Sequence, residues 1–128
     1  PNDYASMLGE KMQKHGTHVF LINTGWSGGP FGIGARMDIN ITRALVDAAL
    51  NGVLDNVEYE ENTLFHLSVP KTCPGVPAEI LNPQNTWKDK EAYRRRAEKL
   101  ASEFSAHFDK TYGNKNIDPE VTKQCPGK

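Results

Sequence analysis

Residues 18–37 read HVFLINTGWSGGPFGIGARM, and this stretch decides the fold. Its first part, 18–22, is a short continuous apolar run, which is typical of a strand buried on both faces. The ten residues 25–34 hold five glycines and one proline, which predict a loop. The stretch therefore predicts a buried strand that leads into a glycine-rich loop.

An amphipathic helix is expected before the apolar run. Over residues 3–15 the apolar side chains Tyr4, Leu8 and Met12 recur every four residues, and Gly16 follows as a stop signal. A helix that leads into a buried strand indicates an α/β fold.

Alternating polarity follows the loop. From residue 36 to residue 42, apolar and polar side chains alternate, which predicts a half-buried strand with one polar face. Residues 42–51 have helical spacing, with Asn40 or Thr42 as a cap at the start and Gly52 at the end. We therefore expect a strand, a turn and a short helix.

Two further strand patterns and a proline-rich arm come next. Strands are expected at 57–59 and 64–69, separated by an acidic turn at 60–62. Four prolines between residues 70 and 87 exclude a helix interior, so this part of the chain is expected to be an irregular surface arm.

A long amphipathic helix is the clearest element of the sequence. It is expected to run from a cap at Asp89 to Gly113. Its apolar side chains recur every three or four residues, at Tyr93, Ala97, Leu100, Phe104, Phe108 and Tyr112. Together the patterns predict an α/β fold with flanking helices and a long C-terminal helix.

Length, net charge and the absence of a long apolar run limit the classes of protein to which this chain can belong. A chain of 128 residues is enough for one domain at most. Sixteen acidic and fifteen basic residues leave a net charge of −1, so the chain lacks the excess of positive charge that is expected of a nucleic-acid-binding protein. No apolar run approaches the length of a membrane span, which is about 18 residues or more. We therefore expect neither nucleic acid nor a membrane as a partner.

The start of the chain and the cysteines bear on its processing and location. The sequence begins at Pro1 without an initiator methionine, which indicates processing or excision from a longer chain, and this segment carries no secretory signal. Cys73 and Cys125 could pair in one disulfide, but two reduced thiols are favoured. The expected location is the cytoplasm.

The glycine-rich loop lacks the residues of the known phosphate-binding motifs. A Walker A loop ends in Gly-Lys-Ser/Thr, whereas Ala35 and Arg36 follow the last glycine here. The dinucleotide-binding spacing also fails, because Met37 stands where its third glycine belongs. A mobile or tightly folded loop beside an active site is therefore favoured over an independent phosphate site.

Arg36 and Thr42 are the candidate ligand contacts that spacing offers. An arginine plane and a nearby hydroxyl can hold a base and a sugar. A straight strand would keep the two residues about 20 Å apart, which is too far for one nucleoside. The chain must therefore turn near Asn40 if both contact one ligand. Spacing alone favours structural roles for these two residues, on a solvated strand face and in a helix cap, over contact with a ligand.

Other polar side chains give no sign of a metal or catalytic centre. The four histidines lack metal-ligand spacing, and the cysteines have no C-x-x-C partners. The arginines at 94–96 fan around a helix, which favours a solvated face. The acidic residues at 58–61 have no basic or nucleophilic companion, so general acid–base catalysis has no specific support.

The sequence resembles the ATP-dependent phosphoenolpyruvate carboxykinases over nearly its whole length. The likeness begins at residues 21–37 and continues through 42–44 and 47–52. It extends through 69–77 and 80–87 into the long helix. What the chain matches is the C-terminal portion of a much longer enzyme.

The resemblance implies a fold and a reaction. Residues 1–128 would be a single incomplete domain, the C-terminal segment of a nucleotide-binding domain with a mixed sheet. The family are lyases that decarboxylate oxaloacetate and use ATP to give phosphoenolpyruvate, CO₂ and ADP, with Mg²⁺ and Mn²⁺. This is an early step of gluconeogenesis or, in reverse, of CO₂-fixing fermentation.

The resemblance also implies that the chemistry lies outside this segment. The family's phosphate loop with its lysine, its Mn²⁺ ligands and its oxaloacetate-binding arginines are upstream, so no catalytic or metal-binding residue is expected here. The expected partners are oxaloacetate, ATP and the remainder of the parent chain. The isolated segment is expected to be inactive.

Three residues of this chain correspond to residues that contact the nucleotide in the family. The arginine of the family's Gly-x-Arg-Met/Ile segment corresponds to Arg36, with Met37 beside it, and the threonine of its Thr-Arg-Ala segment corresponds to Thr42. In the family these residues contact the adenosine end of ATP. The resemblance therefore favours nucleotide contact for Arg36 and Thr42, whereas spacing alone favoured a solvated strand face and a helix cap. Ala35 departs from the lysine or other polar residue of many relatives, which is expected to weaken contact with phosphate.

An alternative interpretation belongs to a different class of protein. The chain could be an independently expressed binding or assembly module that retained the fold and lost catalysis. The absence of the upstream motifs from this segment is compatible with it.

Overall fold

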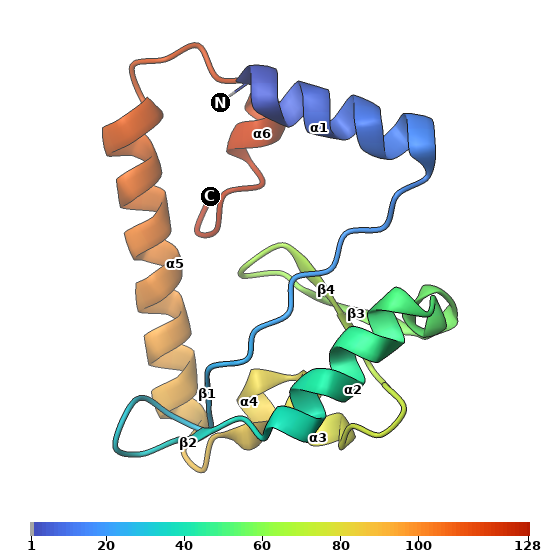
Figure 1. The fold of residues 1–128 in the computed structure, drawn as a ribbon. Helices are drawn as coiled ribbons and strands as arrows, with labels where there is room; N and C mark the ends of the chain where they lie inside the picture. The colour runs from blue at the N-terminus through green and yellow to red at the C-terminus, as the bar shows by residue number, and fades with distance from the viewer. Residues whose placement is uncertain (1) are drawn as a thin grey trace. The chain divides into compact units, whose positions relative to one another are not determined.

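The computed structural model describes residues 2–128. The chain forms two compact units, of which unit 2 comprises residues 20–62 and 67–96 and unit 1 the remainder. Figure 1 shows the labelled elements along the chain. Helices and two small antiparallel sheets make this a mixed α/β structure, as the sequence predicts.

Helix α1 (Asn2–His15) confirms the first predicted element. Asp3 in the first turn and Lys14 in the last turn complement the helix dipole. Gly16 ends the helix with a φ of +59°, a left-handed conformation that glycine adopts without strain.

Residues 17–24 have no regular secondary structure, so the buried strand predicted at 18–22 is wrong. Leu21 is 84% exposed and Val19 is 63% exposed. A strand needs a neighbour for its backbone N–H and C=O groups. In the part of the chain that the structure describes, no strand pairs with this segment. An apolar run alone therefore does not make a strand.

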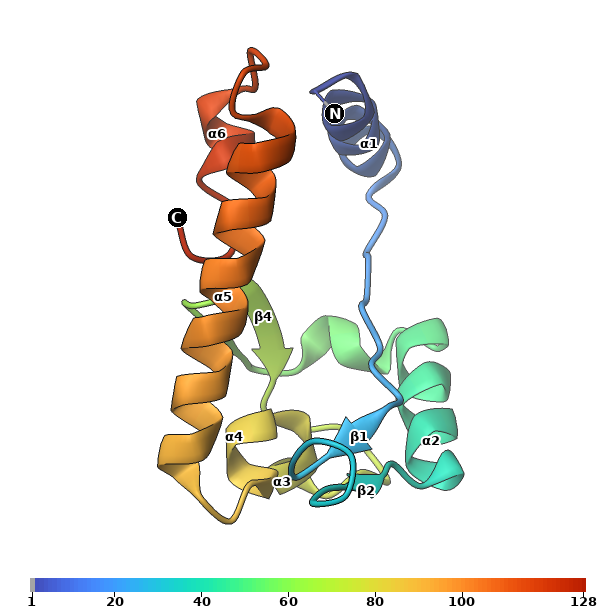
Figure 2. The same ribbon diagram turned by 90° about the vertical axis from the view of Figure 1, so that its left-hand side faces the viewer.

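The glycine-rich loop joins the two strands of a short hairpin in unit 2. Strand β1 (Trp26–Ser27) pairs antiparallel with β2 (Ala35–Arg36). Of the loop predicted at 25–34, residues 28–34 are confirmed and connect the two strands. Figure 2 shows this hairpin next to the start of helix α2.

Helix α2 (Ile39–Leu50) replaces most of the strand predicted at 36–42, which is wrong beyond Arg36. The helix begins early because Asp38 caps it, and the Asp38 carboxylate accepts a hydrogen bond from the Asn40 N–H at 2.7 Å. This cap outweighs the alternation of polarity.

The core of unit 2 forms between α2, the 3₁₀ turn η1 (Val53–Asn56) and residues 73–81. Its buried side chains are Ala48, Leu54, Cys73 and Val76. Half-buried apolar side chains surround them: Phe20, Ile41, Ala44, Leu45, Ala49, Val57, Ile80 and Leu81. This packing fixes the position of α2, which begins directly after the hairpin.

Strands β3 (Tyr59–Asn62) and β4 (Leu67–Pro70) form the second hairpin. Four residue pairs join them, from Tyr59 opposite Pro70 to Asn62 opposite Leu67. Two strands are present, but their predicted bounds are wrong: β3 shares only Tyr59 with the strand predicted at 57–59, the acidic residues lie in β3, and the turn lies at 63–66. Residues 59–61 of β3 are exposed, so glutamates are tolerated in the strand.

The proline-rich arm contains two single-turn helices, α3 (Ala78–Leu81) and α4 (Pro83–Thr86). Pro83 stands at the first helical position, where its missing N–H costs nothing. The side chain of Asn82 caps α4 by accepting from the Gln84 N–H at 3.1 Å. The predicted irregular arm is therefore only partly irregular, because prolines also begin short helices.

Helix α5 (Lys90–Tyr112) confirms the long helix and both of its ends. The Asp89 carboxylate accepts a hydrogen bond from the Ala92 N–H at 2.9 Å, and the Gly113 N–H donates to the backbone oxygen of Asp109 at 2.8 Å. No helix in residues 2–128 is long and apolar enough to cross a membrane.

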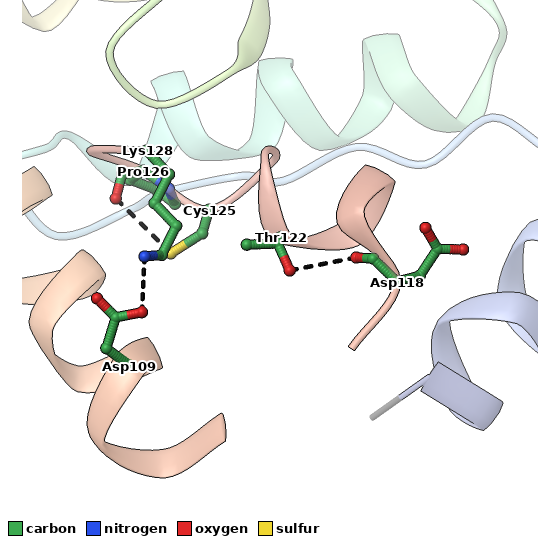
Figure 3. Close-up of polar contacts among 6 residues, drawn as sticks. All are labelled: Asp109, Asp118, Thr122, Cys125, Pro126 and Lys128. Carbon is green, nitrogen blue, oxygen red and sulfur yellow. Dashed lines mark hydrogen bonds and ion pairs between the residues drawn. The ribbon is translucent and has the colours of Figure 1, made fainter. Parts of the chain in front are cut away.

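The C-terminal segment folds back onto the second half of α5 in unit 1. It contains helix α6 (Pro119–Thr122). The Lys128 ammonium group lies 2.7 Å from an Asp109 carboxylate oxygen, and the Cys125 thiol donates to the Pro126 backbone oxygen. Figure 3 shows both contacts. The contact with Asp109 joins the last residue of the chain to helix α5.

Candidate functional site

The loop between β1 and β2 is tightly folded. The Pro30 backbone oxygen accepts hydrogen bonds from the N–H groups of Ile33 at 3.0 Å and Gly34 at 2.9 Å. A Cβ atom at position 34 would lie 2.4 Å from the Gly29 oxygen, so only glycine fits there. Of the two loop types that the sequence allowed, the structure has the tightly folded one.

The loop holds the two strands so that Trp26 lies directly opposite Arg36. Arg36 is exposed, and Trp26 is 49% exposed. Across the loop, the Phe31 ring meets the Trp26 ring edge to face, with centroids 5.2 Å apart. The hairpin therefore presents an arginine and an aromatic pair to solvent.

A turn at Met37 and Asp38 brings Thr42 toward Arg36. The Met37 N–H donates to the Gly25 oxygen at 3.0 Å, and helix α2 begins two residues later. Three extended steps and one helical turn then separate Arg36 from Thr42, a path of at most about 15 Å. The turn comes before Asn40, and it removes the distance objection that a straight strand would raise.

Neither candidate side chain is satisfied within the chain. Among residues 2–128, the Arg36 guanidinium and the Thr42 hydroxyl have no hydrogen-bond or ion-pair partner. Thr42 is half-buried in the first turn of α2, and Met37 is half-buried beside it. The site thus combines a free cation, a free hydroxyl and an apolar contact.

The described residues do not fit a metal ion. No three His, Cys, Asp or Glu side chains in residues 2–128 come together in a way that could hold one. Cys73 and Cys125 are both free thiols.

Shifted pKa values occur in the packed parts of the chain. Burial raises the pKa of the Cys73 thiol. Burial also raises the pKa of Tyr59, with smaller contributions from Asp55 and Cys73, and the Tyr59 hydroxyl donates to the Leu54 oxygen at 2.9 Å. Burial alone raises the pKa of Tyr93. These groups have structural roles in unit 2.

Sequence reasoning missed Asp38, which positions Thr42. Its signal was present, because an Asp directly before the apolar residues Ile39 and Ile41 is a common helix start. The clean alternation of polarity concealed it.

Comparison with known proteins places the candidate residues in a matched region. The family model described as phosphoenolpyruvate carboxykinase matches residues 1–79, which include Arg36, Met37 and Thr42. The chain is 52% identical over 126 residues to phosphoenolpyruvate carboxykinase (ATP) of Caldanaerobacter subterraneus subsp. tengcongensis, covering 98% of the chain and 24% of that relative.

Two further relatives show the same pattern. Phosphoenolpyruvate carboxykinase (ATP) 1 of Moorella thermoacetica is 56% identical over 110 residues, and phosphoenolpyruvate carboxykinase (ATP) of Thermus thermophilus is 54% identical over 110 residues. Each match covers 86% of the chain and 21% of the relative. The chain spans about a quarter of the length of these relatives, or less.

Proposed function

The chain belongs to the phosphoenolpyruvate carboxykinase family, and from that premise we propose that it supplies the adenosine-binding wall of an ATP-dependent phosphoenolpyruvate carboxykinase. Residues 1–128 form one incomplete domain, the C-terminal segment of the nucleotide-binding domain. The whole cytoplasmic enzyme converts oxaloacetate and ATP to phosphoenolpyruvate, CO₂ and ADP.

One observation carries the proposal. The turn at Met37 and Asp38 shortens the path between an exposed, unpaired arginine in β2 and an unpaired hydroxyl in the first turn of α2, within the part of the chain that matches the family model. An arginine that folding leaves without a carboxylate can pair with a ligand at no cost to an existing ion pair.

The chemistry of adenosine fits these side chains. The adenine ring is flat and has hydrogen-bonding nitrogens at its edge, and ribose has two hydroxyls. The Arg36 guanidinium can stack on the base or donate to the ribose oxygens. The Thr42 hydroxyl can donate to or accept from the edge of adenine. Met37 adds an apolar contact to the base.

The remaining chemistry belongs to the rest of the parent chain. We assign the ligands of oxaloacetate, of the phosphate groups and of the metal ions, together with the catalytic residues, to the part of the parent chain upstream of this segment. The isolated chain should not turn over oxaloacetate. ATP-dependent decarboxylation by the pure 128-residue chain would contradict this part of the proposal.

A chimeric enzyme tests the adenosine assignment. The chain replaces the matched segment of the Caldanaerobacter relative, and Arg36→Ala is then made in the chimera. Loss of a charge-assisted contact should raise the KM for ATP about tenfold or more and leave the KM for oxaloacetate within about twofold. Lys71→Ala, which removes a surface cation of the second hairpin, is the control and should change neither KM. Equal increases in both KM values would contradict the assignment.

The coding sequence upstream of Pro1 separates this proposal from a non-catalytic module. A glycine-rich loop that ends in Gly-Lys-Thr in the same reading frame supports the enzyme. A start codon directly before Pro1 supports the module.

A further inference from the structure

We propose that Trp26 is a stacking platform for the purine base of the bound nucleotide and forms, with Arg36, a two-residue clamp on one face of the β1–β2 hairpin. This inference rests on the proposed function, because it names a further binding residue for the same nucleotide. It adds a residue to which neither spacing nor family resemblance assigned a role.

The backbone hydrogen bonds place the two side chains together. The Met37 N–H donates to the Gly25 oxygen, so the next pair along the ladder, Trp26 and Arg36, is a non-hydrogen-bonded pair. In such a pair both side chains lie on the same face, with Cβ atoms about 5 Å apart. A flat indole and a flat guanidinium therefore leave the hairpin side by side.

The Trp26 ring is both held and accessible. Phe31 contacts it edge to face at an interplanar angle of 86°, which restricts its rotation, and the indole remains 49% exposed. Phe31 is itself 84% exposed, so this contact is not part of a covered core. The tight loop, closed by hydrogen bonds to Pro30, keeps Phe31 in place.

The other tryptophan serves a different purpose and gives the control. Trp87 is half-buried and packs edge to face against Tyr93, with centroids 5.7 Å apart. Burial raises the pKa of Tyr93, as expected for a ring in a packed junction between α4 and α5. Trp87 is therefore structural, and Trp26 is the indole that a ligand can reach.

Stacking and edge recognition make different contributions to selectivity. Every purine has a π face, so stacking on Trp26 gives affinity for the base without choosing between adenine and guanine. A hydrogen bond from the Thr42 hydroxyl to the base edge would distinguish them. Loss of Trp26 should therefore weaken ATP and GTP binding equally, whereas Thr42→Ala should change their ratio.

The direct test uses the fluorescence of Trp26. In the Trp87→Phe chain, Trp26 is the only tryptophan, since the sequence has two. ATP and adenosine should quench its emission, and inorganic tripolyphosphate, which has no base, should not. Absence of quenching by ATP and adenosine, or equal quenching by tripolyphosphate, would overturn the inference.

Binding measurements on variants separate this inference from the proposed function. Trp26→Ala should weaken ATP binding between about fivefold and a hundredfold, and Trp26→Phe, which keeps a ring and the packing of the hairpin, should retain most of it. If Arg36→Ala weakens binding but Trp26→Ala does not, the proposed function stands and this inference fails. If neither variant weakens it, both fail.

Discussion

The two hairpins of this chain differ in how particular charged side chains are paired. In the second hairpin, the Glu58 carboxylate lies 3.4 Å from the Lys71 ammonium group. The Glu60 carboxylate accepts a hydrogen bond from the Asn82 side-chain amide at 2.7 Å. In the first hairpin, Arg36 has no such partner among the described residues. Glu58 and Glu60 are thus held by neighbouring side chains, whereas the Arg36 guanidinium is free to contact a ligand.

The hairpins also differ in what sets their shape. Four residue pairs join β3 to β4, whereas only two join β1 to β2. So short a ladder cannot fix a hairpin by itself, and the first hairpin depends on its loop. A substitution that distorts that loop should therefore weaken ATP binding, and loss of an ion pair in the second hairpin should not.

The largest expected effect comes from Gly34→Ala. The new Cβ would lie 2.4 Å from the Gly29 oxygen and 2.6 Å from the Ser27 oxygen, so the loop must open. We expect a loss of about 3 kcal/mol in the free energy of unfolding, measured in urea, and loss of ATP binding.

Gly32→Ala is the matched control in the same loop. No atom lies within 4 Å of the added Cβ, and the cost is the strain of a φ of +87°, about 1–2 kcal/mol. Equal losses for the two variants would show that close packing at Gly34 does not determine the loop.

Asp38→Ala should have an intermediate effect. It removes the cap of α2 and should lower the free energy of unfolding by about 1 kcal/mol. Because Thr42 lies in the first turn, ATP binding should weaken as well. Asp38→Asn keeps a capping oxygen and should restore both properties, and failure of this rescue would indicate that the cap does not position the site.

The buried thiol predicts a change in stability that is confined to alkaline pH. Burial raises the pKa of Cys73, so the native state holds this proton more tightly than the unfolded chain. The resulting stability is complete below the ordinary thiol pKa, about 8.5, and is lost as the pH rises through the raised value.

Urea unfolding over a series of pH values measures this effect. The free energy of unfolding should fall more steeply above about pH 8.5 in the wild-type chain than in Cys73→Ala. The pKa of Tyr59 is raised too, mainly by burial, and this main contribution is common to both chains; Cys73→Ala removes only the smallest contribution, that of Cys73. Identical pH slopes would contradict the assignment.

The smallest effect is expected for Lys71→Ala in the second hairpin. The pair with Glu58 is exposed, and such pairs contribute about 0.5 kcal/mol or less. ATP binding should be unchanged. A clear loss of ATP binding would mean that the two hairpins do not divide structure from ligand contact.

Long periodic elements could be predicted from the sequence. Helices α1 and α5 each repeat an apolar side chain every three or four residues and end at a glycine, and both are confirmed. The apolar run at 18–22 failed, because a strand depends on a partner that no pattern within the run reveals. The pattern at 36–42 failed because one carboxylate, that of Asp38, selected a helix.

The candidate site was only partly accessible to sequence reasoning. Arg36 and Thr42 came from family resemblance, since their spacing on a straight strand argued against a shared ligand. The turn before α2 removes that objection, and their contact with adenosine stays a prediction. Trp26 could not be found from spacing, because its neighbour Arg36 lies ten residues away and meets it only across the hairpin.

An NMR titration of the isotopically labelled chain with adenosine tests the central claim most directly, because it observes both hairpins at once. The largest changes in amide chemical shift are expected at Trp26, Arg36, Met37 and Thr42, and the amides of residues 59–70 should stay unchanged. Shifts that are largest in 59–70, or no shifts at the highest adenosine concentration, would contradict an adenosine site at the first hairpin.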